Sequence, residues 1–129
     1  MFLIIGALLA GLAVTLGAFG AHGLKRVVDS DTVAIYQTGV QYQMYHAIAL
    51  LFIGIMAERI ANSFINYAGL FLIGGIVFFS GSLYLIASLK AINKVVPKAI
   101  GIMTPLGGLL FITGWVLLLI GIIKRTDLS

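Results

Sequence analysis

Charged residues divide this sequence into four long uncharged runs, and their spacing constrains the fold more than any other feature. The charges fall in four short clusters, at residues 25–31, 58–59, 90–98 and 124–127. The runs between them cover residues 1–24, 32–57, 60–89 and 99–123. Each run exceeds the ~20 residues that an α-helix needs to cross the ~30 Å hydrocarbon core of a bilayer. The pattern predicts four membrane-spanning helices, at about residues 2–23, 31–58, 66–89 and 99–123.

The composition supports a membrane protein and excludes an ordinary soluble domain. Of the 129 residues, 61% are hydrophobic and 9% are charged, whereas soluble domains are roughly half apolar and a quarter charged. The short loops favour an up-down arrangement of consecutive helices. We therefore expect one all-α domain over residues 1–129, an integral membrane four-helix bundle.

The positive charge is placed at helix ends rather than on one surface. The net charge is +4, but these side chains would meet lipid headgroups, so we expect membrane lipid as a partner and no nucleic acid. The first and third loops hold five basic residues (Lys25, Arg26, Lys90, Lys94 and Lys98), and the opposite side holds three (Arg59, Lys124 and Arg125). Because cytoplasmic loops are enriched in Lys and Arg, this count predicts both termini outside the cytoplasm.

Small residues form a stripe on the first and the last predicted helix. On the first helix the stripe consists of Gly6, Ala10, Ala13 and Gly17, and on the last helix of Gly107, Gly114 and Gly121. Such stripes let helix backbones approach closely in lipid. We expect these two helices to make the tightest contacts, within one bundle or between copies of the chain, with Leu118 facing lipid.

The candidate site consists of polar residues that are costly to place in a bilayer. On the second helix, one side carries Thr38, Gln41, Tyr42, Tyr45 and His46. Ser80 and Tyr84 follow one another at helical spacing on the third helix, His22 ends the first helix and Thr104 begins the fourth. Polar groups in a membrane must find partners inside the bundle or water. The pattern predicts a polar pocket or a hydrogen-bonded core.

His46 is the candidate on which the functional hypothesis depends most. It is expected to be either a neutral imidazole bonded to hydroxyls such as those of Tyr42, Tyr45, Ser80 and Tyr84, or a group that binds a ligand or transfers protons. A haem or metal shared with His22 is disfavoured because the two histidines are expected at different depths. The chain has no cysteine, so zinc–thiolate sites are excluded; we expect no metal and no cofactor.

All four carboxylates, Asp29, Asp31, Glu58 and Asp127, lie at the borders of the runs. Neither paired-carboxylate catalysis nor a Ser-His-Asp arrangement is therefore expected within the spans, because both need a carboxylate there. A proton-coupled multidrug exporter, a four-helix class of similar size, would need a membrane-embedded glutamate. The sequence favours a protein that is not an enzyme.

Four motifs occur in order along the chain: residues 17–24 (GAFGAHGL), 36–47 (YQTG running into YQMYHA), 79–84 (FSGSLY) and 104–108 (TPLGG), the last followed by Gly114-Trp115. Together they resemble the bacterial domain of unknown function 423 family, which is similar to the small eukaryotic transmembrane protein 256 group. The resemblance covers essentially the whole chain and implies a multi-pass protein of the bacterial cytoplasmic (inner) membrane, of unassigned function. It also adds Gln43 and Ser82 to the candidate residues.

Two classes of function follow from these observations. The first is a non-enzymatic binding or accessory protein whose polar pocket takes a lipid-like ligand or a partner helix. The alternative is a small transporter or channel, which would be oligomeric because four helices leave little space for an aqueous path. A homo-oligomer or another membrane protein is the expected protein partner.

Overall fold

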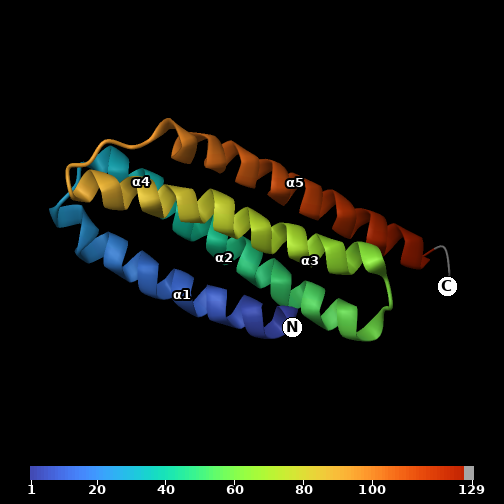
Figure 1. Ribbon diagram of the computed structural model, residues 1–129. Helices are drawn as coiled ribbons and strands as arrows, with labels where there is room; N and C mark the ends of the chain where they lie inside the picture. The colour runs from blue at the N-terminus through green and yellow to red at the C-terminus, as the bar shows by residue number, and fades with distance from the viewer. Residues whose placement is uncertain (127–129) are drawn as a thin grey trace.

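The computed structural model describes residues 1–126 and contains only helices within that range (Figure 1). In chain order they are α1 (Phe2–His22), the short 3₁₀ helix η1 (Leu24–Arg26), α2 (Ser30–Arg59), α3 (Ser63–Gly75), the π-helical turn η2 (Ile76–Ser80), α4 (Gly81–Ala91) and α5 (Lys98–Thr126). α3, η2 and α4 follow one another without a break and form one rod. Asp127, one of the border carboxylates, lies outside the described residues.

Four stretches of the described chain are long and apolar enough to cross a membrane: Phe2–Arg26, Ser30–Arg59, Ser63–Ala91 and Lys98–Lys124. The prediction of an all-α protein with four spanning helices is therefore confirmed. The described end of α5 lies at the same end of the molecule as the N-terminus, and the loops at residues 23–29 and 92–97 lie at the other (Figure 1).

Side-chain caps decide where two of the helices begin. The Asp29 carboxylate accepts a hydrogen bond from the Thr32 backbone amide at 2.7 Å and starts α2. The Asn62 side chain accepts from the Phe64 amide at 2.9 Å and starts α3. Both residue types are favoured at this position because they satisfy amides that have no partner in the first turn. The Asn62 cap places the start of the third span three residues earlier than predicted.

Close helix pairs follow the order of the chain. α1 packs along α2, α2 packs along the α3–η2–α4 rod, and α5 packs along the other side of that rod. Within one bundle, the prediction that the first and last helices, α1 and α5, pack tightly together is wrong, because α1 and α5 are not among the closely packed pairs; contact between copies of the chain stays a prediction. Short connections hold consecutive helices side by side.

The small residues do lie at helix contacts, but at contacts with those other neighbours. A Cβ atom placed on Gly6 would lie 2.9 Å from the Ala47 carbonyl oxygen of α2. On α5, a Cβ atom at Gly107 would overlap the backbone of Phe79, and one at Gly114 would lie 2.6 Å from the Leu72 side chain. Gly17 and Gly121 likewise face Val40 and Ile65, and Ala10 is half-buried.

The apolar core lies between α2, α3 and α5. Leu50 and Ile53 of α2 are fully buried against Ile65 and Leu72 of α3. Leu118 of α5 belongs to the same cluster, with 9% of its surface exposed. The expectation that Leu118 faces lipid is therefore wrong, since α5 turns this face toward α3.

Candidate functional site

Gln43 joins three helices by hydrogen bonds at the centre of the polar region. It is buried on α2, donates from Nε2 to the Leu9 carbonyl oxygen of α1 at 2.8 Å, and accepts at Oε1 from the Tyr84 hydroxyl of α4 at 2.7 Å. Both ends of the amide are thus satisfied, as a buried polar group requires. This residue entered the candidate set only through the family motif, because it lies off the polar side drawn for the second helix.

Ser80 makes the next link between α2 and the rod. Its buried hydroxyl donates to the Gly39 carbonyl oxygen at 2.7 Å. Ser80 ends the π-helical turn, in which the Gly81 amide binds the Ile76 carbonyl five residues back. Such a turn widens the helix by one residue and often occurs at functional positions. The turn ends at Ser80, and in the regular α4 that follows, Ser80 and Tyr84 lie one helical turn apart and both bind α2, as their spacing indicates.

Ser82 and Thr104 join the rod to α5. Their hydroxyl oxygens are 2.6 Å apart, and the Ser82 hydroxyl also donates to the Phe79 carbonyl oxygen at 2.8 Å. Since Ser82 has only one hydroxyl proton, Thr104 is the donor in the bond between the two side chains. The pair is therefore fully satisfied without any bound molecule.

His46 is buried and lies between α2 and α5. Its ring stacks on Phe111, with ring centres 3.5 Å apart and planes 6° from parallel. Nδ1 lies 2.6 Å from the Tyr42 carbonyl oxygen, and the Trp115 indole donates to Nε2 at 3.1 Å. An indole N–H can only donate, so Nε2 is the acceptor and this hydrogen-bond network assigns the proton to Nδ1. The geometry is that of a neutral imidazole.

These partners differ from those expected for His46. The prediction that hydroxyls of Tyr42, Tyr45, Ser80 or Tyr84 bind the imidazole is wrong, because a backbone carbonyl and an indole take both ring nitrogens. The hydroxyls of Ser80 and Tyr84 instead bind α2 elsewhere. Sequence spacing within one helix carries no information about α5, which supplies Trp115 and Phe111.

The remaining candidates lie outside this network. His22, Gln41 and Tyr45 are exposed, and the Thr38 hydroxyl donates to the Ala34 carbonyl within its own helix at 3.0 Å. Tyr42 is partly exposed and stacks on Phe79, with ring centres 4.5 Å apart. Within residues 1–126, no group of three or more His, Cys, Asp or Glu side chains is arranged to hold a metal.

Two further hydrogen bonds between elements involve Tyr36 and Asn62, which are not among the predicted site residues. The Tyr36 hydroxyl donates to the Leu16 carbonyl oxygen at 2.8 Å, joining α2 to α1. The Asn62 amide donates to the Gly121 carbonyl oxygen at 3.0 Å, joining the second loop to α5. Tyr36 stands in the quoted motif and could have been included, whereas Asn62 looked like an ordinary loop residue.

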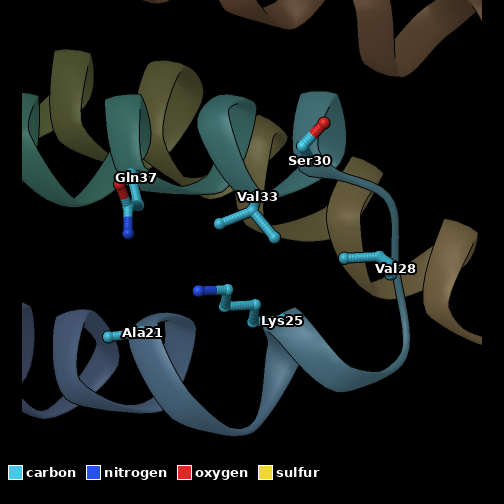
Figure 2. A pocket seen from close by; sticks show the side chains of 6 residues that line it. All are labelled: Ala21, Lys25, Val28, Ser30, Val33 and Gln37. Atoms are coloured by element: carbon cyan, nitrogen blue, oxygen red, sulfur yellow. The ribbon is translucent and has the colours of Figure 1, made fainter.

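A pocket of about 430 Å³ lies away from the polar core, between the end of α1 and the first turns of α2. It is lined by Ala21, Lys25, Val28, Ser30, Val33 and Gln37. Figure 2 shows the Lys25 ammonium and the Gln37 amide directed into the gap between the two helices. Neither side chain forms an ion pair or hydrogen bond with any other part of the chain that the structure describes. None of the residues that line this pocket is among the candidate site residues predicted from the sequence.

Comparison with known proteins places the chain among small bacterial membrane proteins. A family model described as "Protein of unknown function (DUF423)" matches residues 16–108. Curated relatives include UPF0382 membrane proteins of Staphylococcus saprophyticus (44% identical over 124 residues, 96% of this chain and 98% of the relative) and of Staphylococcus aureus strain bovine RF122 (42% over 124 residues, 96% of each chain). The Bacillus subtilis UPF0382 membrane protein YwdK is 39% identical over 125 residues, 96% of this chain and 97% of the relative.

No solved structure gives a significant match. The family match and the near full-length relatives agree with the motifs and with the four apolar helices. This chain belongs to the DUF423 family of bacterial membrane proteins, whose function is unknown.

Proposed function

We propose that this protein is a non-enzymatic lipid-binding protein of the bacterial cytoplasmic membrane. It holds the headgroup phosphate of an anionic lipid in the pocket between α1 and α2. The observation that carries this proposal is the pair of unpartnered polar groups, the Lys25 ammonium and the Gln37 amide, directed into one pocket of about 430 Å³. An ammonium and an amide N–H are the donors that a phosphate oxygen accepts.

The size and depth of the pocket fit a headgroup rather than a whole lipid. Its volume falls in the range of ~300–1,000 Å³ found for small-molecule sites. Lys25 lies at the end of the first span, and Gln37 lies seven residues into α2, roughly 10 Å along the helix. The site thus extends from the headgroup region to the first acyl carbons, where Ala21, Val28 and Val33 supply apolar walls.

The charge distribution supports binding on the cytoplasmic leaflet. The loops beside the pocket and beside α5 carry Lys25, Arg26, Lys90, Lys94 and Lys98. If these loops are cytoplasmic, as the Lys and Arg count favours, both termini are outside. Basic side chains at that surface attract anionic lipids.

The buried polar core supports a structural role better than it supports a transport path. Its side chains, among them Gln43, Ser80, Ser82 and His46, bind one another or neighbouring backbones across packed helices. A lipid at the α1–α2 pocket leaves all these bonds in place. We therefore favour lipid binding over a transporter or channel.

The test measures thermal unfolding of the purified full-length protein in detergent, with added phosphatidylglycerol or phosphatidylcholine. A ligand that binds only the folded state raises the unfolding temperature. We expect phosphatidylglycerol to stabilise the protein more than phosphatidylcholine does. Lys25→Gln should weaken this effect at least about tenfold in lipid concentration, since charge-assisted hydrogen bonds contribute ~1.5–3 kcal/mol.

Lys94→Gln is the matched control, because it removes the same charge from an exposed residue at the same end of the molecule, outside the pocket. Lys94→Gln should retain the response to phosphatidylglycerol. If the two variants lost the stabilisation by phosphatidylglycerol equally, the lipid would be attracted only by the charge of the surface, and the proposal would be overturned. A response reproduced in full by inorganic phosphate would overturn lipid as the ligand.

A further inference from the structure

The outward face of α2 carries an unpaired amide close to the middle of the membrane. Asp31 and Glu58 mark the two ends of this helix and are about 27 residues apart, roughly 40 Å along the axis. Gln41 lies about 5 Å from the midpoint on this measure. Its side chain is exposed and makes no hydrogen bond within the described part of the chain.

An amide in this position is costly if lipid is its only neighbour. Acyl chains offer neither donor nor acceptor, and an unsatisfied polar group in the hydrocarbon core costs several kcal/mol. On the inward side of α2 at this depth, Gln43 and His46 are buried and bonded. On the outward side, the Gln41 amide and the Tyr45 hydroxyl are both exposed and have no partner within the described residues, so this side points to a partner outside this chain.

The exposed residues of α2 also follow a seven-residue repeat. Positions separated alternately by four and three residues lie along it: Ala34, Thr38, Gln41, Tyr45, Ile48, Phe52 and Ile55. All are exposed except Thr38, which is partly buried. Alternate spacings of four and three are those of a left-handed coiled-coil seam, in which two helices pack at about 20°. Gln41 would then occupy a core position of the seam.

We propose that the occupant of this seam is a second copy of the chain, packed α2 against α2 around a two-fold axis along the membrane normal. The five-to-three Lys and Arg count favours one orientation for every copy; two such helices then run parallel and bring identical residues to the same depth. An amide both donates and accepts, and Gln41 is therefore complementary to itself. A polar side chain at a core position of a seam of this kind favours one register of a parallel pair.

This inference does not depend on the lipid pocket. The two sites use different side chains: Lys25 and Gln37 on one, and Gln41, Tyr45 and Ile48 on the other. Failure of either proposal leaves the other intact. The lipid test measures thermal stabilisation, and the dimer test measures crosslinking.

The natural absence of cysteine makes a direct crosslinking test possible. Ile48→Cys places one thiol on the seam with Gln41 intact, in full-length protein reconstituted into phospholipid vesicles. We expect oxidation to give a disulfide-linked dimer, because facing core positions of a parallel pair lie within the ~7 Å Cα separation that a disulfide allows. Ile112→Cys is the control, since Ile112 is also exposed and lies near the middle of α5.

The role of the amide is tested in the Ile48→Cys background. Gln41→Leu should lower the dimerisation constant by about three- to thirtyfold, the range of interhelix hydrogen bonds in membranes. Thr113→Val should leave it unchanged, because the exposed Thr113 hydroxyl already binds the Leu109 carbonyl oxygen of its own helix at 2.8 Å.

Three outcomes would overturn the proposal. The first is equal crosslinking of Ile112→Cys and Ile48→Cys, which would indicate random collision. The second is a dimerisation constant that Gln41→Leu leaves unchanged. The third is an Ile48→Cys protein that stays monomeric. If Ile48→Cys stays monomeric in vesicles but crosslinks to another polypeptide in native membranes, a different membrane protein covers the seam.

Discussion

The bond between Gln43 and Tyr84 offers the sharpest test of how the buried polar side chains act. The Tyr84 hydroxyl donates to Gln43 Oε1 at 2.7 Å, and Gln43 Nε2 donates to the Leu9 carbonyl oxygen at 2.8 Å. Gln43→Leu removes both bonds and leaves the Tyr84 hydroxyl without its acceptor. A buried polar group left unpaired costs ~1–3 kcal/mol, whereas the mean for an interhelix hydrogen bond in a membrane is only ~0.6 kcal/mol. We expect a loss of about 1–2 kcal/mol in the free energy of unfolding.

A double-mutant cycle separates the bond from the packing of the side chains. Tyr84→Phe alone leaves Gln43 Oε1 unpaired, and Gln43→Leu alone leaves the tyrosine hydroxyl unpaired. The double variant leaves neither, so its loss should be smaller than the sum of the single losses by about 0.5–2 kcal/mol. The assay is equilibrium unfolding of the purified protein in mixed detergent micelles, followed by circular dichroism.

Tyr45→Phe provides the control for removing a tyrosine hydroxyl. Tyr45 is 58% exposed and has no hydrogen-bond partner within residues 1–126. Its replacement should change the free energy of unfolding of the monomer by less than about 0.5 kcal/mol. Additive losses in the Gln43–Tyr84 cycle, or equal losses from Tyr45→Phe and Tyr84→Phe, would refute the claim that this bond stabilises the three-helix junction.

Three further predictions address the α5 contacts and the topology. Trp115→Phe and His46→Leu should each lower the free energy of unfolding by about 1 kcal/mol. Because the two residues share one hydrogen bond, the loss in the double variant should be smaller than the sum of the single losses. Additive losses would contradict this. Gly114→Ala should lower the unfolding temperature, because the new Cβ would meet Leu72 at 2.6 Å, whereas Gly11→Ala, whose Cβ meets nothing within 4 Å, should leave it unchanged or raise it; equal shifts would count against the packing. A C-terminal reporter that is active only in the cytoplasm should stay inactive, and a positive signal would reverse the predicted topology.

The number and limits of the spans could be predicted from the sequence because they depend on local properties. A charge such as Lys25 or Glu58 inside a span is costly wherever the neighbouring helices lie, so the uncharged runs alone located four helices. Their ends shifted by only a few residues, as at Asn62, where a cap adds a turn. The likeness of the motifs to the DUF423 family was equally accessible, since it rests on residue order.

Helix partners and hydrogen-bond partners could be decided only by the tertiary structure. The small faces around Gly6 and Gly114 were recognised from the sequence, but a stripe of small residues does not specify which helix it meets. His46 was recognised as costly in a membrane, yet the partner of its Nε2 is Trp115, which lies 69 residues further along the chain on α5. The free-energy cost of a polar group in lipid depends on that residue alone. The hydrogen bond that offsets this cost depends on two residues, and which two residues meet is decided by how the helices pack.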